Sequence, residues 1–421
     1  MAATVGTAAL TDPLTVPCGQ TIPNRLMRSA LSEALADPDG RPSGGLARLY
    51  GRWSQAGTHG LIVTGNVMVD RRHLGEPGNV VVEDDRHLDA LAAWAAAGRI
   101  GGNRLWMQIN HPGRQASPLV TGNRSVAPSA VASKLPGYTT PRALSHDEIE
   151  EIVGRYAACA AVAQRAGFDG VQLHGAHGYL ISQFLSPLVN QRDDAWGGDP
   201  ERRMRFVLEV LRAVRAAVGD DFPVAIKLNS ADFQRGGFDE QESMAVVDRL
   251  ASEGVDLVEV SGGTYGTPAM MGKVERESTR QREAYFQTYA EEVRRRTPGL
   301  PLALTGGFRT RTGMQAALDD GACDLVGLGR APCVDPDVGV ELLAGRREHA
   351  PVGDRRIGLR PLLGLVTDLR PLDGAIDLQW HTDQLHRMAA GDEPDPSRPW
   401  FLTALRMLRR FGTAGLRPKR G

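Results

Sequence analysis

The chain has 421 residues, of which 42% are hydrophobic and 24% charged, a composition typical of a globular protein with a sizeable core. Its 49 Lys and Arg residues nearly balance 50 Asp and Glu residues, so the formal net charge of -1 gives no reason to expect a nucleic acid or a membrane surface as partner. The N-terminal segment lacks the basic residues of a signal peptide, and no run reaches the roughly 18 apolar residues of a membrane helix. We therefore expect neither export nor a membrane-spanning segment.

The four cysteines are scattered and form no C-x-x-C pair. This pattern predicts neither a disulfide framework nor an iron–sulfur or zinc site, and it favours the reducing cytoplasm. The cysteines are Cys18, Cys159, Cys323 and Cys333.

Short β-rich segments alternate with amphipathic segments, which is typical of βαβ units and a parallel sheet. Eight predicted strands suit a closed (β/α)8 TIM barrel, an α/β fold that fills about 250 residues or more as one unit. No G-x-G-x-x-G motif, the usual signature of an open dinucleotide-binding sheet, follows the first strand. The predicted strands are Asn24–Ala30, Gly60–Val67, Arg104–Ile109, Gly170–His174, Val224–Leu228, Asp256–Val260, Pro301–Thr305 and Asp324–Leu328.

The intervening segments are predicted helices, most of which begin after a polar residue or proline that can cap or open a helix. They are Gly44–Ala56, Arg86–Ala97, Asp147–Ala166, Pro200–Val218, Glu240–Glu253, Arg282–Arg296 and Gly313–Asp319. From about Asp335 onward the pattern becomes Arg-rich. We expect residues 1–340 to form the barrel and residues 341–421 to form a helical extension packed on it, with helices over Trp380–Ala390 and Trp400–Phe411.

Two histidines and a tyrosine follow the fourth predicted strand, in the segment His174-Gly-Ala-His-Gly-Tyr. In a barrel the chemistry lies at the C-terminal ends of the strands. Two imidazoles and a phenol at one strand end provide hydrogen-bond donors and a proton donor that suit a substrate carbonyl. Histidine pairs also bind metals, but no helical carboxylate-and-histidine motif accompanies this pair, so we expect no metal.

The last two predicted strands are followed by Gly306-Gly307 and Gly329-Arg330, where barrels commonly bind phosphate. Glycines let backbone N–H groups approach an anion, and an arginine adds charge-assisted hydrogen bonds. The residues predict a phosphate site without identifying its owner, because FMN and sugar phosphates present the same group.

Several separated motifs, in the right order over roughly residues 11 to 340, together resemble the old yellow enzyme family of NADH:flavin oxidoreductases, which is sometimes grouped with 2,4-dienoyl-CoA reductases. The resemblance implies an FMN-containing barrel that takes electrons directly from NADH or NADPH, since the cysteines of longer iron–sulfur relatives are absent. The motifs are Ile22-Pro-Asn-Arg-Leu-Met, Gln108-Ile-Asn-His-Pro-Gly-Arg, the His174 segment, Lys227-Leu-Asn-Ser-Ala-Asp-Phe, Thr305-Gly-Gly-Phe and Asp324-Leu-Val-Gly-Leu-Gly-Arg.

The same resemblance assigns residues to the flavin. It implies that Gly65 leaves room for the ring, that the Gln108 amide pairs with its pyrimidine edge, and that Lys227 places a cation where negative charge collects on reduction. The structural alternative for Gly65 is a simple turn glycine, and that for Lys227 is a surface cation at a strand end. The implied flavin-binding residues are Ala30, Leu31, Ser32, Gly65, Gln108, Lys227, Gly306, Gly307, Gly329 and Arg330.

On the substrate side, His174 and His177 resemble the pair that binds the carbonyl oxygen of an α,β-unsaturated substrate, and Tyr179 resembles the proton donor to the α-carbon. A packed tyrosine is the structural alternative for Tyr179. Some relatives carry another tyrosine after the first strand, but Glu33 occupies that segment here, and Tyr265 is a candidate replacement.

We therefore expect hydride transfer from NADH or NADPH through FMN to an activated C=C bond of a small-molecule substrate. The same scaffold supports oxidative demethylation or dehydrogenation. A flavin-free phosphate-binding barrel that uses Lys227 as a Schiff base, and a non-catalytic FMN-binding module, are further alternatives. The Arg-rich tail leaves room for a contact between subunits of a homo-oligomer.

Overall fold

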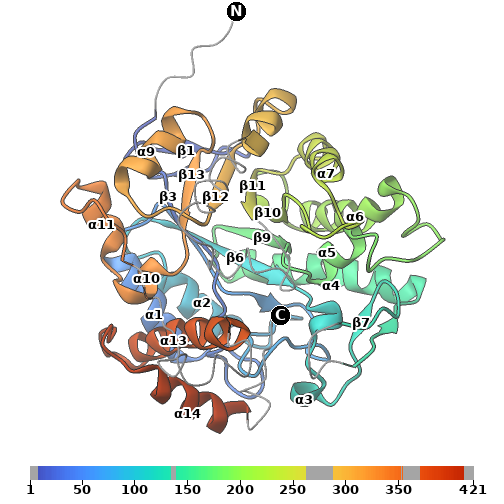
Figure 1. Ribbon diagram of the computed structural model, residues 1–421, viewed down its shortest axis with the longest axis horizontal. Coiled ribbons are helices and arrows are strands. Elements are labelled where there is room, and N and C mark those ends of the chain that lie inside the picture. Colours follow the sequence, from blue (N-terminus) through green and yellow to red (C-terminus); the bar gives the residue numbers. More distant parts are fainter. Residues whose placement is uncertain (1–7, 134–138, 262–287, 352, 354–369, 412–421) are drawn as a thin grey trace, which may run out of the picture.

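The computed structural model describes residues 8–133, 139–261, 288–351, 353 and 370–411. Eight parallel strands pair in sequence order, and β13 returns to pair with β3, so the expected barrel is confirmed (Figure 1). A short strand, β5 (Val67–Met68), pairs with the end of β6. The barrel strands are β3 (Leu26–Arg28), β4 (Leu61–Val63), β6 (Arg104–Asn110), β9 (Gly170–Gly175), β10 (Val224–Asn229), β11 (Leu257–Ser261), β12 (Leu302–Thr305) and β13 (Leu325–Leu328).

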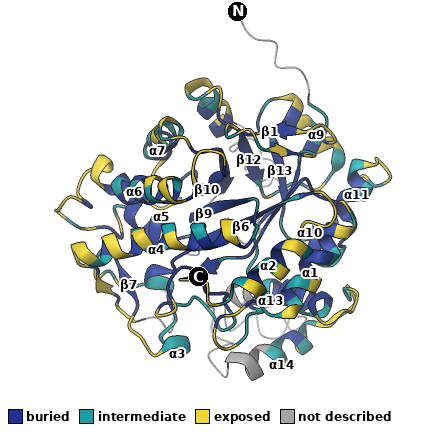
Figure 2. Cartoon of the chain, turned by 180° about the vertical axis from the view of Figure 1, so that it is seen from behind, coloured by how far each residue is buried: buried dark blue, intermediate teal, exposed yellow. Residues whose placement is uncertain are grey.

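Helices cover the outside of the barrel, with their buried faces against the strands and their exposed faces outward (Figure 2). Ser145 and Glu148 form a reciprocal capping box at α4, while the Asp199 and Asp239 carboxylates cap α6 and α7. The helices are α1 (Gly44–Gln55), α2 (Leu88–Ala97), α3 (Pro118–Thr121), α4 (His146–Arg165), α5 (Leu180–Leu185), α6 (Pro200–Val218), α7 (Glu240–Ser252), 288–296, α9 (Arg311–Asp319), α10 (Ala331–Val334), α11 (Val338–Leu343), α13 (Arg370–Ala390) and α14 (Trp400–Phe411).

The interior of the barrel changes from apolar to polar along the strands. A lower layer of buried apolar side chains consists of Met27, Leu61, Trp106, Ala225, Leu257, Ala303 and Leu325. Side chains alternate along a strand, so the residue two positions later also points inward. On five strands this later residue is polar: Ser29, Gln108, Lys227, Glu259 and Thr305. The sequence thus builds a polar layer at the C-terminal ends of the strands, where barrels carry their chemistry.

The prediction of one strand over Gly60–Val67 was wrong, because β4 ends at Val63 and β5 begins only at Val67. Between them, the Gly65 N–H donates to Oε1 of Glu33 at 2.8 Å. A side chain therefore takes the backbone donor that a continuous strand would offer to its neighbour.

The helix α13 lies along α1, beside the barrel (Figure 1). Its Ala389 carbonyl accepts a hydrogen bond from Nε of Arg48 at 2.8 Å, and Nε2 of His386 lies 2.7 Å from the Glu33 carbonyl oxygen. The helix begins ten residues before the predicted segment, whereas α14 has the predicted bounds. Among the described residues, no helix is long and apolar enough to cross a membrane.

Candidate active site

The structure brings His174, His177 and Tyr179 together where β9 ends. The centroid of the His174 ring lies 5.1 Å from that of His177 and 4.6 Å from that of Tyr179, with an angle of 89° between the His174 and Tyr179 planes. His174 and Tyr179 are both buried. Two imidazoles and a phenol thus surround one small volume, as their spacing in the sequence predicted.

Burial of His174, with the charge of Lys227 as a smaller cause, lowers the pKa of the His174 imidazole to about 3. The ring is therefore neutral around pH 7. A neutral imidazole has one N–H donor and one acceptor nitrogen. His174 can therefore bind a substrate oxygen through a hydrogen bond without bringing a full positive charge into the site.

The turn that carries His177 has an unusual backbone. His177 has φ of 61° and Gly178 has φ of 75°, and for a residue with a side chain the left-handed region is disfavoured. The His177 N–H donates to Oδ1 of Asn229 at 3.2 Å, and Nε2 of Gln115 donates to the carbonyls of His177 and Gly178 at 2.9 and 2.7 Å. The His177 Nε2 also lies 2.7 Å from Oγ of Ser261. Neighbouring strand ends thus hold a strained residue in place, as is common at functional sites.

The polar layer of the barrel forms one connected hydrogen-bond network around Glu259. Its Oε1 accepts from Nζ of Lys227 at 2.8 Å and from Oγ1 of Thr305 at 2.6 Å, and its Oε2 accepts from Nε2 of Gln172 at 2.8 Å. Nε2 of Gln108 in turn donates to Oε1 of Gln172 at 2.8 Å. Our sequence reasoning found Gln108 and Lys227 but missed Glu259 and Gln172. Their signal was a polar residue within a strand that is buried on both faces.

The predicted phosphate site has open space beside its backbone. Gly306 and Gly307 have φ of 121° and 84°, and a Cβ added to Gly306 or Gly329 would meet no atom of the described residues within 4 Å. Arg330 lies beside them, and its Nη1 is 3.2 Å from Oδ2 of Asp377 in α13. A guanidinium has five N–H donors, so this ion pair leaves donors for a bound anion.

The space beside Gly65 is filled by the protein itself. A Cβ on Gly65 would lie 1.9 Å from Oε2 of Glu33 and 2.5 Å from the Leu31 carbonyl oxygen. The buried Glu33 carboxylate also accepts a hydrogen bond from the Tyr50 hydroxyl of α1. Gly65 is therefore required by the close approach of Glu33, whatever it also offers to a cofactor.

The other predicted residues of the first strand end lie in the same loop. The Ser32 hydroxyl donates to the Glu76 carboxylate. Ala30 packs against the apolar interior of the barrel, and Leu31 packs against the core between the strands and the helices. The remaining candidate, Tyr265, lies outside the described residues.

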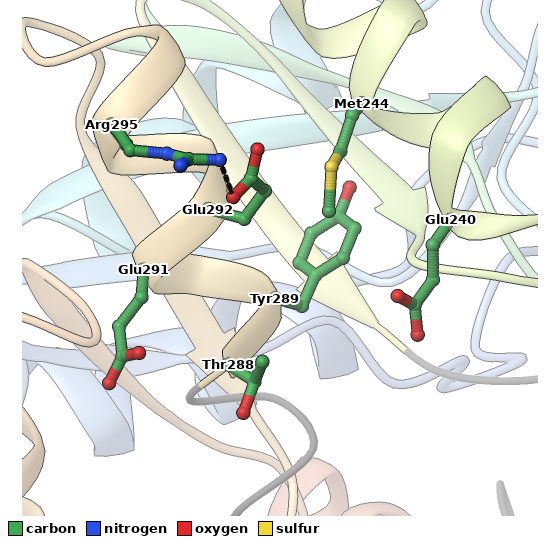
Figure 3. A pocket seen from close by; sticks show the side chains of 7 residues that line it. All are labelled: Glu240, Met244, Thr288, Tyr289, Glu291, Glu292 and Arg295. Carbon is green, nitrogen blue, oxygen red and sulfur yellow. Dashed lines mark hydrogen bonds and ion pairs between the residues drawn. The ribbon is translucent and has the colours of Figure 1, made fainter.

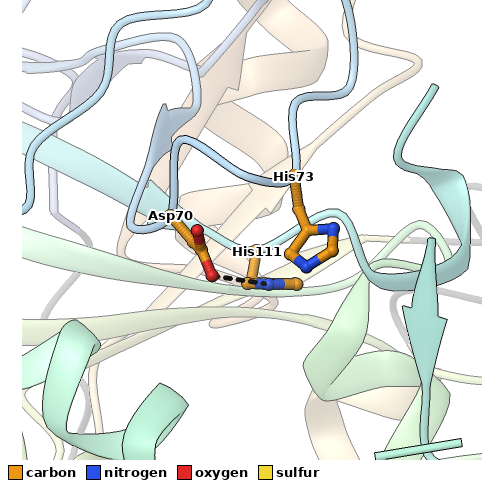
Figure 4. A group of neighbouring side chains, drawn as sticks. All are labelled: Asp70, His73 and His111. Carbon is orange, nitrogen blue, oxygen red and sulfur yellow. Dashed lines mark ion pairs between the residues drawn. The ribbon is translucent and has the colours of Figure 1, made fainter. Parts of the chain in front are cut away.

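A buried group of Asp70, His73 and His111 has the composition of a metal site (Figure 4). However, Nε of Arg72 donates to Oδ1 of Asp70 at 2.9 Å and its Nη2 to Oδ2 at 2.7 Å. The Gly113 N–H donates to Nδ1 of His111, so the neutral ring carries its hydrogen on Nε2, which faces Asp70 at 3.9 Å. Arg72 therefore occupies the carboxylate oxygens of Asp70, and the hydrogen on Nε2 of His111 points where a cation would have to bind.

A pocket on the outside of the barrel lies between α7 and the helix over 288–296 (Figure 3). Its walls contain none of the predicted site residues. The lining residues are Glu240, Met244, Thr288, Tyr289, Glu291, Glu292 and Arg295.

A closed barrel whose strand ends carry paired glycines, a buried lysine and a histidine pair is compatible with the class of flavin-binding oxidoreductases, and the comparisons with known proteins place the chain in that class. The chain is a member of the NADH:flavin oxidoreductase / NADH oxidase family, whose model matches residues 9–349. This confirms the family expected from the sequence motifs.

Individual relatives agree with this assignment. The chain is 37% identical over 350 residues to the NADH-dependent flavin oxidoreductase iliE of Hypocrea jecorina, and the match covers 77% of this chain and 86% of that protein. It is 35% identical to the NADH oxidase of Thermoanaerobacter brockii, with 78% of this chain and 50% of that longer protein covered. Among solved structures, an old yellow enzyme homologue from Zymomonas mobilis superposes with a TM-score of 0.71 at 28% identity, with 82% and 95% of the two chains covered.

The protein is therefore an enzyme that uses FMN, with a reduced nicotinamide as electron donor. The residues present fit this cofactor. No described atom lies within 4 Å of a Cβ built on Gly306 or Gly329, so their backbone can be approached, and Gln108 and Lys227 supply hydrogen-bond donors at the mouth of the barrel. Nζ of Lys227 lies 2.8 Å from Oε1 of Glu259 in a buried ion pair, so this nitrogen is held by a carboxylate, which disfavours the Schiff-base alternative.

Proposed function

We propose that this enzyme reduces the activated C=C bond of an α,β-unsaturated carbonyl compound, with NADH or NADPH as the source of hydride. The observation that carries the proposal is the contact of the His174 ring with both His177 and Tyr179. A pair of imidazoles suits a carbonyl oxygen, and a phenol beside them suits proton delivery to carbon.

We further propose that Gly306, Gly307, Gly329 and Arg330 would hold the FMN phosphate, and that Gln108 and Lys227 would hold its ring. When bound, FMN supplies the hydride that it has received from the nicotinamide. His174 and His177 donate hydrogen bonds to the substrate carbonyl and draw electron density from the β-carbon, which accepts the hydride. Tyr179 delivers a proton to the α-carbon and regains one from solvent. Overall, one hydride and one proton add across the double bond.

An anaerobic absorbance titration tests this proposal. NADH or NADPH should bleach the flavin band of the purified protein, and cyclohexenone or a dienoyl thioester should restore it. If the band bleaches but no activated alkene restores it, the ene-reductase proposal fails, and oxidative demethylation or dehydrogenation on the same scaffold takes its place.

A further inference from the structure

We infer that Glu259 is a positioning residue for the flavin: it fixes the orientation of the Gln108 amide and offsets the charge of Lys227. The inference rests on the FMN cofactor and on the proposed place of its ring over Gln108 and Lys227. It does not depend on the identity of the substrate. Glu259 lies one strand away from Lys227 and is linked to Gln108 through Gln172.

The direction of the hydrogen bonds follows from the chemistry of the carboxylate. An ionised carboxylate only accepts hydrogen bonds, so the Gln172 side chain must turn its NH₂ group toward Glu259. The Gln172 carbonyl then faces Gln108 and accepts from its NH₂ group. As a result, within the part of the chain that the structure describes, the carbonyl oxygen and the second N–H of the Gln108 amide are left for a ligand. Glu259 thereby determines which atoms the Gln108 amide presents to the pyrimidine edge of the ring.

The charge of Glu259 acts on the flavin independently of the amide orientation. The side chains of Lys227 and Glu259 are only 4% and 0% exposed, so water screens their interaction weakly. FMN gains a hydride on reduction, and its reduced ring becomes anionic, which a nearby cation favours. A carboxylate 2.8 Å from the ammonium opposes this preference. Glu259 should therefore keep the flavin midpoint potential lower than Lys227 alone would set it.

The test is Glu259→Gln in the purified holoenzyme and in its apoprotein, with FMN itself as the probe. Removal of the negative charge should shift the two-electron flavin equilibrium toward the reduced form by about tenfold, which corresponds to about 30 mV. Loss of the Glu259 carboxylate should also let the Gln108 amide reverse its orientation, and this reversal should weaken FMN binding to the apoprotein by about tenfold. The midpoint potential is measured against a reference dye, and the dissociation constant from quenching of FMN fluorescence.

The chain offers a matched control next to the start of the same strand. Asp256 lies one residue before β11, at the opposite end of the barrel, where Oδ2 accepts from Arg215 at 2.7 Å and from the Val224 N–H at 2.8 Å. Asp256→Asn also removes a buried carboxylate from an ion pair with arginine. It should lower the melting temperature without moving the flavin potential.

A second variant covers the case in which Glu259→Gln does not fold. The double variant Gln172→Glu with Glu259→Gln exchanges the carboxylate and the amide, so the network keeps its charge and its polar groups. The carboxylate introduced at position 172 would still accept from Gln108, and FMN affinity should stay within about threefold of wild type. The potential should still rise, because the carboxylate no longer contacts Lys227.

An unchanged potential in both folded variants would overturn the inference. So would a loss of FMN affinity in Glu259→Gln that Asp256→Asn reproduces without any potential shift, because that result indicates a purely structural role. If the wild-type apoprotein binds no FMN, the cofactor assignment fails instead, and the two failures are therefore distinguishable.

Discussion

The ring of Tyr179 meets the ring of His174 edge to face, with their centroids 4.6 Å apart. The two residues come from different elements, because His174 belongs to β9 and Tyr179 is the residue before α5. The Ala176 carbonyl accepts from the Tyr179 N–H at 3.3 Å, so the tight turn between them fixes their separation.

The proposed proton transfer predicts a selective effect of Tyr179→Phe. Reoxidation of the reduced flavin by cyclohexenone should slow by about 10²- to 10⁴-fold, because a general acid is lost. Reduction by the nicotinamide should remain within about twofold of wild type, since hydride transfer to the flavin needs no phenol. Stopped-flow absorbance resolves the two half-reactions. Equal slowing of both would contradict the assigned role.

The strained turn at His177 and Gly178 predicts that Gln115, which is not one of the proposed catalytic residues, still affects the rate of the reaction. Gln115→Leu removes two hydrogen bonds to the carbonyls of the His177–Gly178 turn. The alkene half-reaction should slow by about tenfold to a hundredfold through misplacement of His177, with a stability loss of about 1 kcal/mol. FMN affinity should not change. Loss of affinity instead would place Gln115 in the support of the cofactor.

The glycine cradle predicts that a single methyl group weakens FMN binding. Gly329→Ala introduces a Cβ into open space, so the fold should tolerate it, but the methyl group occupies room proposed for the phosphate. The FMN dissociation constant should rise by about tenfold or more. Gly154→Ala, in α4, would also meet no described atom within 4 Å and serves as the control. Similar FMN affinities of the two variants would argue against the cradle.

Buried histidines predict instability in acid. Burial, with the charge of Arg28 as a smaller cause, lowers the pKa of His59 to about 3, and burial lowers those of His111 and His174 to about 3 as well. Below the unfolded value of about 6.5, the unfolded chain binds more protons than the folded one. The free energy of unfolding should therefore keep its full value above about pH 6.5. As the pH is lowered from about 6.5 to about 3, it should decrease by about 1.4 kcal/mol per pH unit for each histidine.

Urea denaturation at about pH 7 and about pH 5 measures this slope. His59→Gln removes a titrating group outside the proposed catalytic residues, and it should reduce the slope by the share of one histidine. A wild-type free energy of unfolding that stays constant over this interval would contradict the lowered pKa values.

Local sequence patterns predicted all eight barrel strands, one of them too long, together with most helices and the cluster at the end of β9, because each depends on residues close together in the chain. Where the prediction failed, a distant residue intervened. The expected strand through Gly65 stops because Glu33, 32 positions earlier, takes its backbone N–H. Periodicity within one segment carries no information about such a partner.

The sequence by itself thus determined the barrel, the family and the place of His174, His177 and Tyr179 at one strand end. Only the tertiary structure revealed that Glu259 lies 2.8 Å from Lys227 and accepts from Gln172. These contacts join strands that are far apart along the chain, and they depend on the register in which the barrel closes. A buried polar side chain needs hydrogen-bond partners among the groups that barrel closure places beside it, and for Glu259 these partners are Lys227 and Gln172 on other strands.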